Sequence, residues 1–155
     1  MGPAALELKI PPVLLTVLFG GMMWLVSRFT PGIATPPELR ITAVLVFAVA
    51  GSFIGLAAVV SFRKASTTVN PLTPEACSSL VESGVFRHSR NPMYLALLLA
   101  LAAWGFHLGN IYSLALTAVF VVYMNRFQIL PEERALETAF GDEFRDYKRR
   151  VRRWL

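Results

Sequence analysis

The feature that most constrains this chain is a set of long stretches without Asp, Glu, Lys or Arg. They lie between Lys9 and Arg28, between Arg40 and Arg63, and between Arg90 and Arg126. A helix of roughly 20 apolar residues crosses the hydrocarbon core of a bilayer, so the third stretch is long enough for two passes. The chain is 55% apolar and only 16% charged, whereas soluble domains carry roughly 25% charged residues. We therefore expect an all-α integral membrane protein.

The uncharged stretches predict four transmembrane helices. They are Pro12 to Val26, Ile41 to Phe62, and a helical hairpin with passes from Met93 to Phe106 and from Ile111 to Phe127. Gly109 and Asn110 favour the hairpin turn, and a Pro- and Gly-rich link over 30–38 separates the first two spans. The first run exceeds the roughly 7 to 15 apolar residues of a signal peptide, so we expect it to be retained.

Small residues in the second span offer a surface for close helix packing. Gly51 and Gly55 form a G-x-x-x-G pair that lets another helix approach, although Gly is also simply frequent in membrane helices. After this span, a polar segment over 63–91 is predicted to contain a short helix. Thr73 is its expected N-cap, Pro74 falls in its first turn, and Gly84 offers a left-handed stop.

The tail after Pro131 is predicted to be helical without crossing the membrane. One apolar stripe recurs at intervals of three or four residues, formed by Leu136, Phe140, Phe144, Tyr147, Val151 and Trp154. This pattern is typical of an interfacial amphipathic helix, and a solvated helix packed on a partner is the alternative. Gly141 and Asp142 suggest a break with a new N-cap at Asp142. The chain thus divides into 1–62, two N-terminal spans, and 63–155, a core of short helix, hairpin and tail.

Basic residues predict the orientation in the membrane. Only Arg28 and Arg40 lie at the ends of the spans opposite to Lys9, the 63–91 segment and the Arg-rich tail. The positive-inside rule then places both termini in the cytoplasm, in a multi-pass protein of the cell (inner) membrane. The net charge of +5 is explained by anionic lipid beside the spans, so we expect no nucleic-acid partner. Cys77, His88 and His107 are too few for a thiolate or histidine metal site.

Two polar sequences flank the hairpin and return to the same membrane face. They are FRHSRNPMY, over 86–94, and NRFQILPEER, over 125–134. Because unpaired charges at the ends of membrane helices are costly, Arg90, Arg126, Glu132 and Glu133 could form a purely structural ion-pair cluster. They could also build one site, since the hairpin brings the two sequences side by side.

The motifs resemble those of a known family. Residues 90–94, RNPMY, resemble the Arg-His-Pro-x-Tyr-x-Gly motif of the isoprenylcysteine carboxyl methyltransferase and phospholipid methyltransferase superfamily, and residues 132–151 resemble its Glu-Glu tail motif. The similarity covers 84–151. Asn91 replaces the family's His and Ala96 its Gly, and Asn cannot titrate near neutral pH. Phe144 stands where the family often has Tyr.

The resemblance implies S-adenosylmethionine-dependent methyl transfer to a lipophilic or lipid-linked acceptor, such as an isoprenylcysteine carboxylate or a phospholipid amine. By that resemblance Arg90, Asn91, Tyr94, Glu132 and Glu133 bind the cofactor, while Arg126 and Glu133 are the catalytic residues. The acceptor and the oligomeric state stay open. Two other functions also stay open: a non-catalytic membrane protein whose basic tail binds lipid, and a nicotinamide-dependent membrane reductase.

Overall fold

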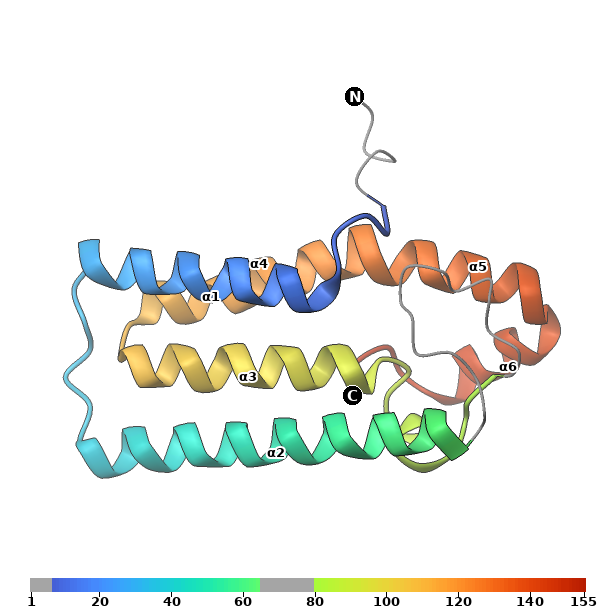
Figure 1. Ribbon diagram of the computed structural model, residues 1–155, viewed down its shortest axis with the longest axis horizontal. Coiled ribbons are helices and arrows are strands. Elements are labelled where there is room, and N and C mark those ends of the chain that lie inside the picture. Colours follow the sequence, from blue (N-terminus) through green and yellow to red (C-terminus); the bar gives the residue numbers. More distant parts are fainter. Residues whose placement is uncertain (1–6, 65–79) are drawn as a thin grey trace.

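The computed structural model describes residues 7–64 and 80–155, and every regular element within them is a helix. In chain order they are α1 (Pro12–Phe29), α2 (Pro37–Lys64), η3 (a 3-10 turn, Gly84–Arg87), α3 (Pro92–Leu108), α4 (Ile111–Tyr123), η4 (a π-helix, Met124–Ile129), α5 (Leu130–Phe140) and α6 (Asp142–Arg150). Figure 1 shows α1, α2, α3 and α4 running side by side, with α3 between α2 and the α1/α4 pair. The helices α5 and α6 lie at one end of this bundle.

Within residues 7–64 and 80–155, three helical stretches are long and apolar enough to cross a membrane. They are α1, α2, and the continuous helical run over Ile111–Phe140 that contains α4, η4 and α5. The fourth predicted pass, α3, is apolar but has 17 residues. Large apolar side chains point outward along the bundle, for example Val17 (66% exposed), Phe53 (70%) and Val122 (67%). The fold is therefore that of a multi-pass helical membrane protein whose outer surface suits lipid.

The small residues of α2 lie against α3, as the G-x-x-x-G pair predicted. A Cβ on Gly51 would lie 3.2 Å from the carbonyl oxygen of Ala96, and a Cβ on Gly55 would lie 3.3 Å from the Cβ of Ala96. Such spacing is tighter than ordinary van der Waals contact, so both glycines are needed for the approach of the two helices. This contact fixes α3 in the middle of the bundle.

The predicted hairpin turn is confirmed. Gly109 ends α3 with φ +59°, in the left-handed region, and Asn110 caps α4 by accepting from the backbone N–H of Ser113 at 2.8 Å. The Asn110 amide also donates to the hydroxyl of Thr30 at 2.8 Å and to the carbonyl of Pro31 at 3.2 Å. The two loops at this end of the bundle are thereby tied together. The predicted loop over 30–38 is shorter than expected, because α2 begins at Pro37.

The tail breaks at Gly141, as the sequence suggested, and its two helices fold back on each other. The chain turns at Gly141, with φ +54°, so that α5 and α6 are separate helices and Gly141, not Asp142, is the N-cap. Phe144, Tyr147 and Val151 are buried and pack with three other apolar side chains, Leu80, Leu136 and Phe140. Because α5 and α6 fold against each other, the apolar side chains of the stripe pack mainly on one another. Little of the stripe is then left to contact lipid.

The short helix predicted around Thr73 and Pro74 lies outside the described residues. Gly84 does adopt the left-handed conformation, with φ +63°, but it begins η3 and does not end a helix. The bundle core consists of buried apolar residues from α1, α3, α4 and η4, namely Leu15, Phe19, Met23, Tyr94, Leu101, Phe120, Met124 and Ile129. Tyr94 thus forms part of the core while its hydroxyl reaches the polar end of the bundle.

Candidate functional site

The end of the bundle where α3 begins gathers polar side chains from distant parts of the chain. Asn91 is the N-cap residue of α3 and Pro92 occupies the first helical position, where its missing N–H costs nothing. The continuous helix from α4 through η4 to α5 passes beside this start. The extended residues that follow α6 run back against it, because the backbone N–H of Arg90 donates to the carbonyl of Arg152 at 2.9 Å.

Glu133 holds two guanidinium groups at the centre of this end. Arg90 Nη2 donates to Glu133 Oε1 at 2.7 Å, and Arg153 donates from Nη2 to Oε2 at 2.6 Å and from Nε to Oε1 at 3.1 Å. The side chains of Arg90 and Glu133 are only 11% and 8% exposed. Arg90 Nη1 also donates to the carbonyls of Lys148 and Val151. A buried two-armed ion pair of this kind fixes the C-terminal residues against the start of α3.

Tyr94 and Glu132 form a second contact beside it. The Tyr94 hydroxyl donates to Glu132 Oε2 at 2.9 Å and accepts from Gln128 Nε2 at 3.3 Å. Gln128 belongs to η4, and π-helical turns of this kind occur frequently at functional sites. Asn91 Nδ2 donates to the carbonyl of Arg153 at 3.0 Å. The structure therefore brings Arg90, Asn91, Tyr94, Glu132 and Glu133 together, as the hairpin argument predicted.

Arg126 lies apart from this cluster. Its Nη1 donates to Glu7 Oε1 at 2.8 Å, and Arg134 binds the other oxygen of the same carboxylate. The hydrogen bond from Arg126 is the main cause that holds the pKa of Glu7 below its ordinary value. The backbone N–H of Leu8 donates to the carbonyl of Phe127 at 3.1 Å. The segment before α1 is thereby pinned across η4, and Arg126 faces this segment.

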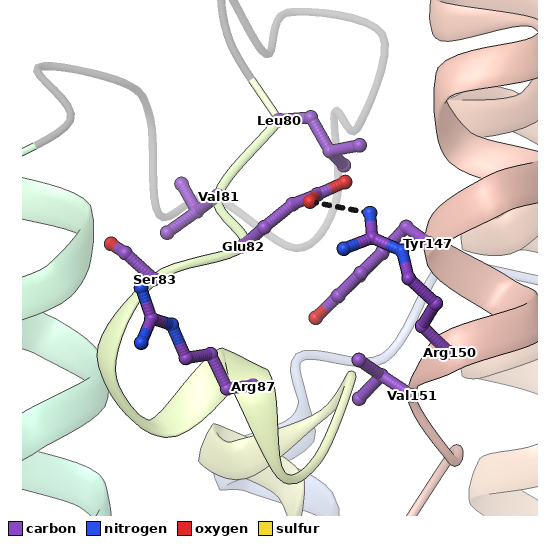
Figure 2. Close-up of a pocket in the computed structure, with 8 residues that line it drawn as sticks. All are labelled: Leu80, Val81, Glu82, Ser83, Arg87, Tyr147, Arg150 and Val151. Atoms are coloured by element: carbon purple, nitrogen blue, oxygen red, sulfur yellow. Dashed lines mark hydrogen bonds and ion pairs between the residues drawn. The ribbon is translucent and has the colours of Figure 1, made fainter.

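Two neighbouring cavities adjoin the cluster. One of about 80 Å³ is lined by residues that include Arg90, Asn91, Glu132 and Glu133. A larger one of about 540 Å³ is lined by Leu80, Val81, Glu82, Ser83, Arg87, Tyr147, Arg150 and Val151. Leu80, Val81 and Tyr147 line both, so the two spaces meet at these residues. Figure 2 shows Glu82 and Arg150 facing each other across the larger cavity, joined by an ion pair of 2.9 Å.

Two polar atoms at these cavities have no partner among the described residues. They are Glu82 Oε1 and Arg90 Nε, and both atoms are buried. Glu82 is among the residues that line the larger cavity and Arg90 among those that line the smaller one. One atom can accept a hydrogen bond and the other can donate one, and buried polar atoms normally find partners.

Several residues of this site were not predicted from the sequence. Glu82, Tyr147, Arg150 and Arg153 all belong to it, but the two arginines lie in a basic run that resembles a solvated helix face. Tyr147 donates to the carbonyl of Phe86 at 2.7 Å, and burial raises its pKa well above the ordinary value, so the hydroxyl stays a donor. Glu82 gave a weak signal, as a lone acid in an otherwise apolar and small-residue stretch before Gly84.

A helical multi-pass membrane protein with one polar, cavity-bearing end is the class that the fold and site define. A family model described as "Phospholipid methyltransferase" matches residues 39–143, which is more than half of the chain. The chain therefore belongs to the phospholipid methyltransferase family, and the predicted membership in the integral-membrane methyltransferase superfamily is confirmed. An uncharacterized protein of Haemophilus influenzae is 52% identical over 63 residues, 41% of this chain and the whole of that protein.

Proposed function

We propose that this protein transfers a methyl group from S-adenosylmethionine to a lipophilic or lipid-linked acceptor at the cytosolic face of the membrane. The observation that supports this most is the contact of the start of α3 with α5. Arg90 lies 2.7 Å from Glu133 and Tyr94 lies 2.9 Å from Glu132, beside two cavities. The family match spans all four of these residues.

The residues fit the proposed cofactor. Ligand pockets in proteins have volumes of roughly 300 to 1,000 Å³, so the cavity of about 540 Å³ is large enough while the one of about 80 Å³ is not. S-adenosylmethionine carries hydroxyl and ammonium donors and a carboxylate. Glu82 lines the larger cavity and its carboxylate can accept from such donors, while Arg87 and Arg150, which line the same cavity, can pair with the carboxylate of the cofactor.

The five predicted cofactor-binding residues divide into two roles in this proposal. Asn91 and Glu132 form part of the wall of the smaller cavity, which meets the larger one, and Tyr94 orients Glu132 through its hydroxyl. Glu133, whose two oxygens are already bound by Arg90 and Arg153, acts by holding that wall in place. When bound, S-adenosylmethionine supplies an electrophilic methyl group on a good leaving group. The chain's own contribution is then alignment of the acceptor and exclusion of water.

The acceptor decides whether a base is needed. A carboxylate or a thiolate attacks without losing a proton, whereas an amine must first be deprotonated. Glu132 lines the smaller cavity and is the candidate base in that case. A catalytic role for Arg126 requires that Glu7 leave its guanidinium, because the structure pairs the two at 2.8 Å.

The topology that completes the proposal has four passes. In it α3 crosses the membrane with α1, α2 and the Ile111–Phe140 run, so both termini and the polar end face the cytoplasm of the cell (inner) membrane. Residues 1–62 then supply two spans and residues 63–155 the methyltransferase core. Support comes from the antiparallel packing of α3 between α2 and α4, and from the basic residues gathered at the polar end.

The test is calorimetric titration of the detergent-solubilised protein with adenosylhomocysteine and, separately, with reduced nicotinamide cofactor. We expect binding of adenosylhomocysteine only, weakened by about tenfold in Tyr94→Phe and Glu132→Gln, since a hydrogen bond to a charged group contributes roughly 1.5 to 3 kcal/mol. Tyr112→Phe is the matched control, because Tyr112 lies exposed near the other end of the bundle. Unchanged binding of adenosylhomocysteine in Tyr94→Phe and Glu132→Gln would contradict the proposed site. Binding of the nicotinamide alone would identify a reductase, and binding of neither a non-catalytic protein.

A further inference from the structure

A third cavity lies at the opposite end of the bundle, far from the polar cluster. It has a volume of about 320 Å³, and its lining is mostly apolar; it includes Leu39, Phe106, Ile111 and Leu114, with Thr35, Arg40 and Asn110 as polar members. These residues come from the loop before α2, the start of α2, the turn between α3 and α4 and the adjoining ends of those two helices, which meet at the end away from α5 and α6 (Figure 1). In the proposed topology the cavity lies near the other membrane surface.

The walls of this cavity are held in a fixed arrangement. The backbone N–H of Ile33 donates to the carbonyl of Gly109 at 2.7 Å. Asn110, only 3% exposed, bonds to Thr30 and Pro31 of the facing loop and to the N–H of Ser113. The hollow thus lies between two loops that are tied to each other, and it is a preformed pocket of the size that ligands occupy.

Among the described residues that line the cavity, Arg40 alone is charged. Its side chain lies over the turn, since a Cβ built on Gly109 would be 3.6 Å from Arg40 Nη1. Among the residues that the structure describes, no hydrogen bond or ion pair of this guanidinium is found. Arg40 is exposed, so its guanidinium can reach an anion outside the chain. In the proposed topology it lies at the end of a membrane helix, where long basic side chains extend to the headgroup region. The anion found there, next to an apolar hollow, is a lipid phosphate.

We propose that this cavity binds one phospholipid of the leaflet opposite to the proposed active site. The phosphate pairs with Arg40, and part of an acyl chain fills the hollow over Phe106 and Leu114. Charge complementarity and an apolar lining beside one cation favour this occupant over a protein segment. The proposal stands apart from the methyltransferase activity, because no residue of the polar cluster takes part in it.

Native mass spectrometry of the full chain in detergent, titrated with phosphatidylglycerol, tests the proposal. We expect one retained lipid, bound about tenfold more weakly in Arg40→Gln because a charge-assisted hydrogen bond is lost. Ala43→Phe, which fills the hollow from α2, should weaken retention by a similar factor. Arg28→Gln is the matched control, since Arg28 lies at the same end but over the ring of Trp24, outside the cavity.

Each other result overturns the proposal. Equal loss in Arg40→Gln and Arg28→Gln would show only general attraction of lipid to surface charge. Retention unchanged in Arg40→Gln would show that the guanidinium binds no phosphate. Loss in Arg40→Gln with full retention in Ala43→Phe would place the lipid outside the hollow. Circular dichroism and size-exclusion profiles identical to those of the wild type are required of each variant, and Leu39→Phe replaces Ala43→Phe if that variant misfolds.

Discussion

Two glutamates one helical turn apart on α5 show how burial decides what a charge does. Glu133 has a side chain that is 8% exposed and binds Arg90 and Arg153, whereas Glu137 is 33% exposed and binds Arg145 and Lys148. Exposed pairs are screened by water and contribute little. Removing one partner of a buried pair leaves the others without compensation. The two residues are therefore suited to a direct comparison.

We expect Glu133→Gln to lower the free energy of unfolding by about 3 to 5 kcal/mol, because Arg90 would stay buried without its counter-charge. Glu137→Gln should cost no more than about 1 kcal/mol. Thermal unfolding of both variants in the same detergent, followed by circular dichroism, measures the difference. Equal losses in the two variants would show that Glu133 does not organise this end of the bundle.

Asn91 stands where the family motif has His, and its contacts explain how Asn fits this position. Its amide donates to the carbonyl of Arg153 at 3.0 Å, and its backbone N–H donates to the Ser89 hydroxyl at 3.1 Å. This contact requires a donor but no titratable group, so Asn meets it without an imidazole. A base at this position is consequently not part of the proposed mechanism.

At the scale of the elements, the uncharged runs and turn residues predicted the long helices closely. Gly109 and Asn110 end one helix and begin the next, because a left-handed residue and a side-chain cap leave few alternatives. The return of α6 onto α5 could not be predicted. A three- and four-residue apolar period is the same for one long helix and for two that fold together. The contacts of Arg90 and Asn91 with carbonyls of residues 151–153 were equally hidden, since any residue offers a carbonyl.

The contact between α2 and α3 gives a prediction of its own. Gly51→Leu should separate the two helices and destabilise the protein by about 1 to 3 kcal/mol, as overpacking does, because its Cβ position lies 3.2 Å from atoms of Ala96 and Leu99. Gly20→Leu is the control, since nothing lies within 4 Å of a Cβ at that site in α1. It should be neutral or stabilising by up to about 1 kcal/mol. Equal unfolding temperatures for the two variants would contradict the close packing.

The whole molecule is polar at one end and nearly uncharged at the other. The cluster around Glu133, the two adjoining cavities and the Arg-rich α6 share one end. The mostly apolar cavity lined by Arg40 occupies the other. This asymmetry suits a protein that meets a water-soluble cofactor on one side and a bilayer throughout its length. The number of passes can be measured from the side of the membrane on which each end of the bundle lies.

We expect a cysteine at position 107 to be labelled from outside the cell and one at position 88 only from inside, since α3 separates the two and both side chains are exposed. The measurement uses His107→Cys and His88→Cys, each in a Cys77→Ser background, and a membrane-impermeant maleimide on intact and then permeabilised cells. Cys77→Ser alone is the control and should take no label. Labelling of both positions from the same side would show that α3 does not cross the bilayer. The proposed four-pass arrangement would then be wrong.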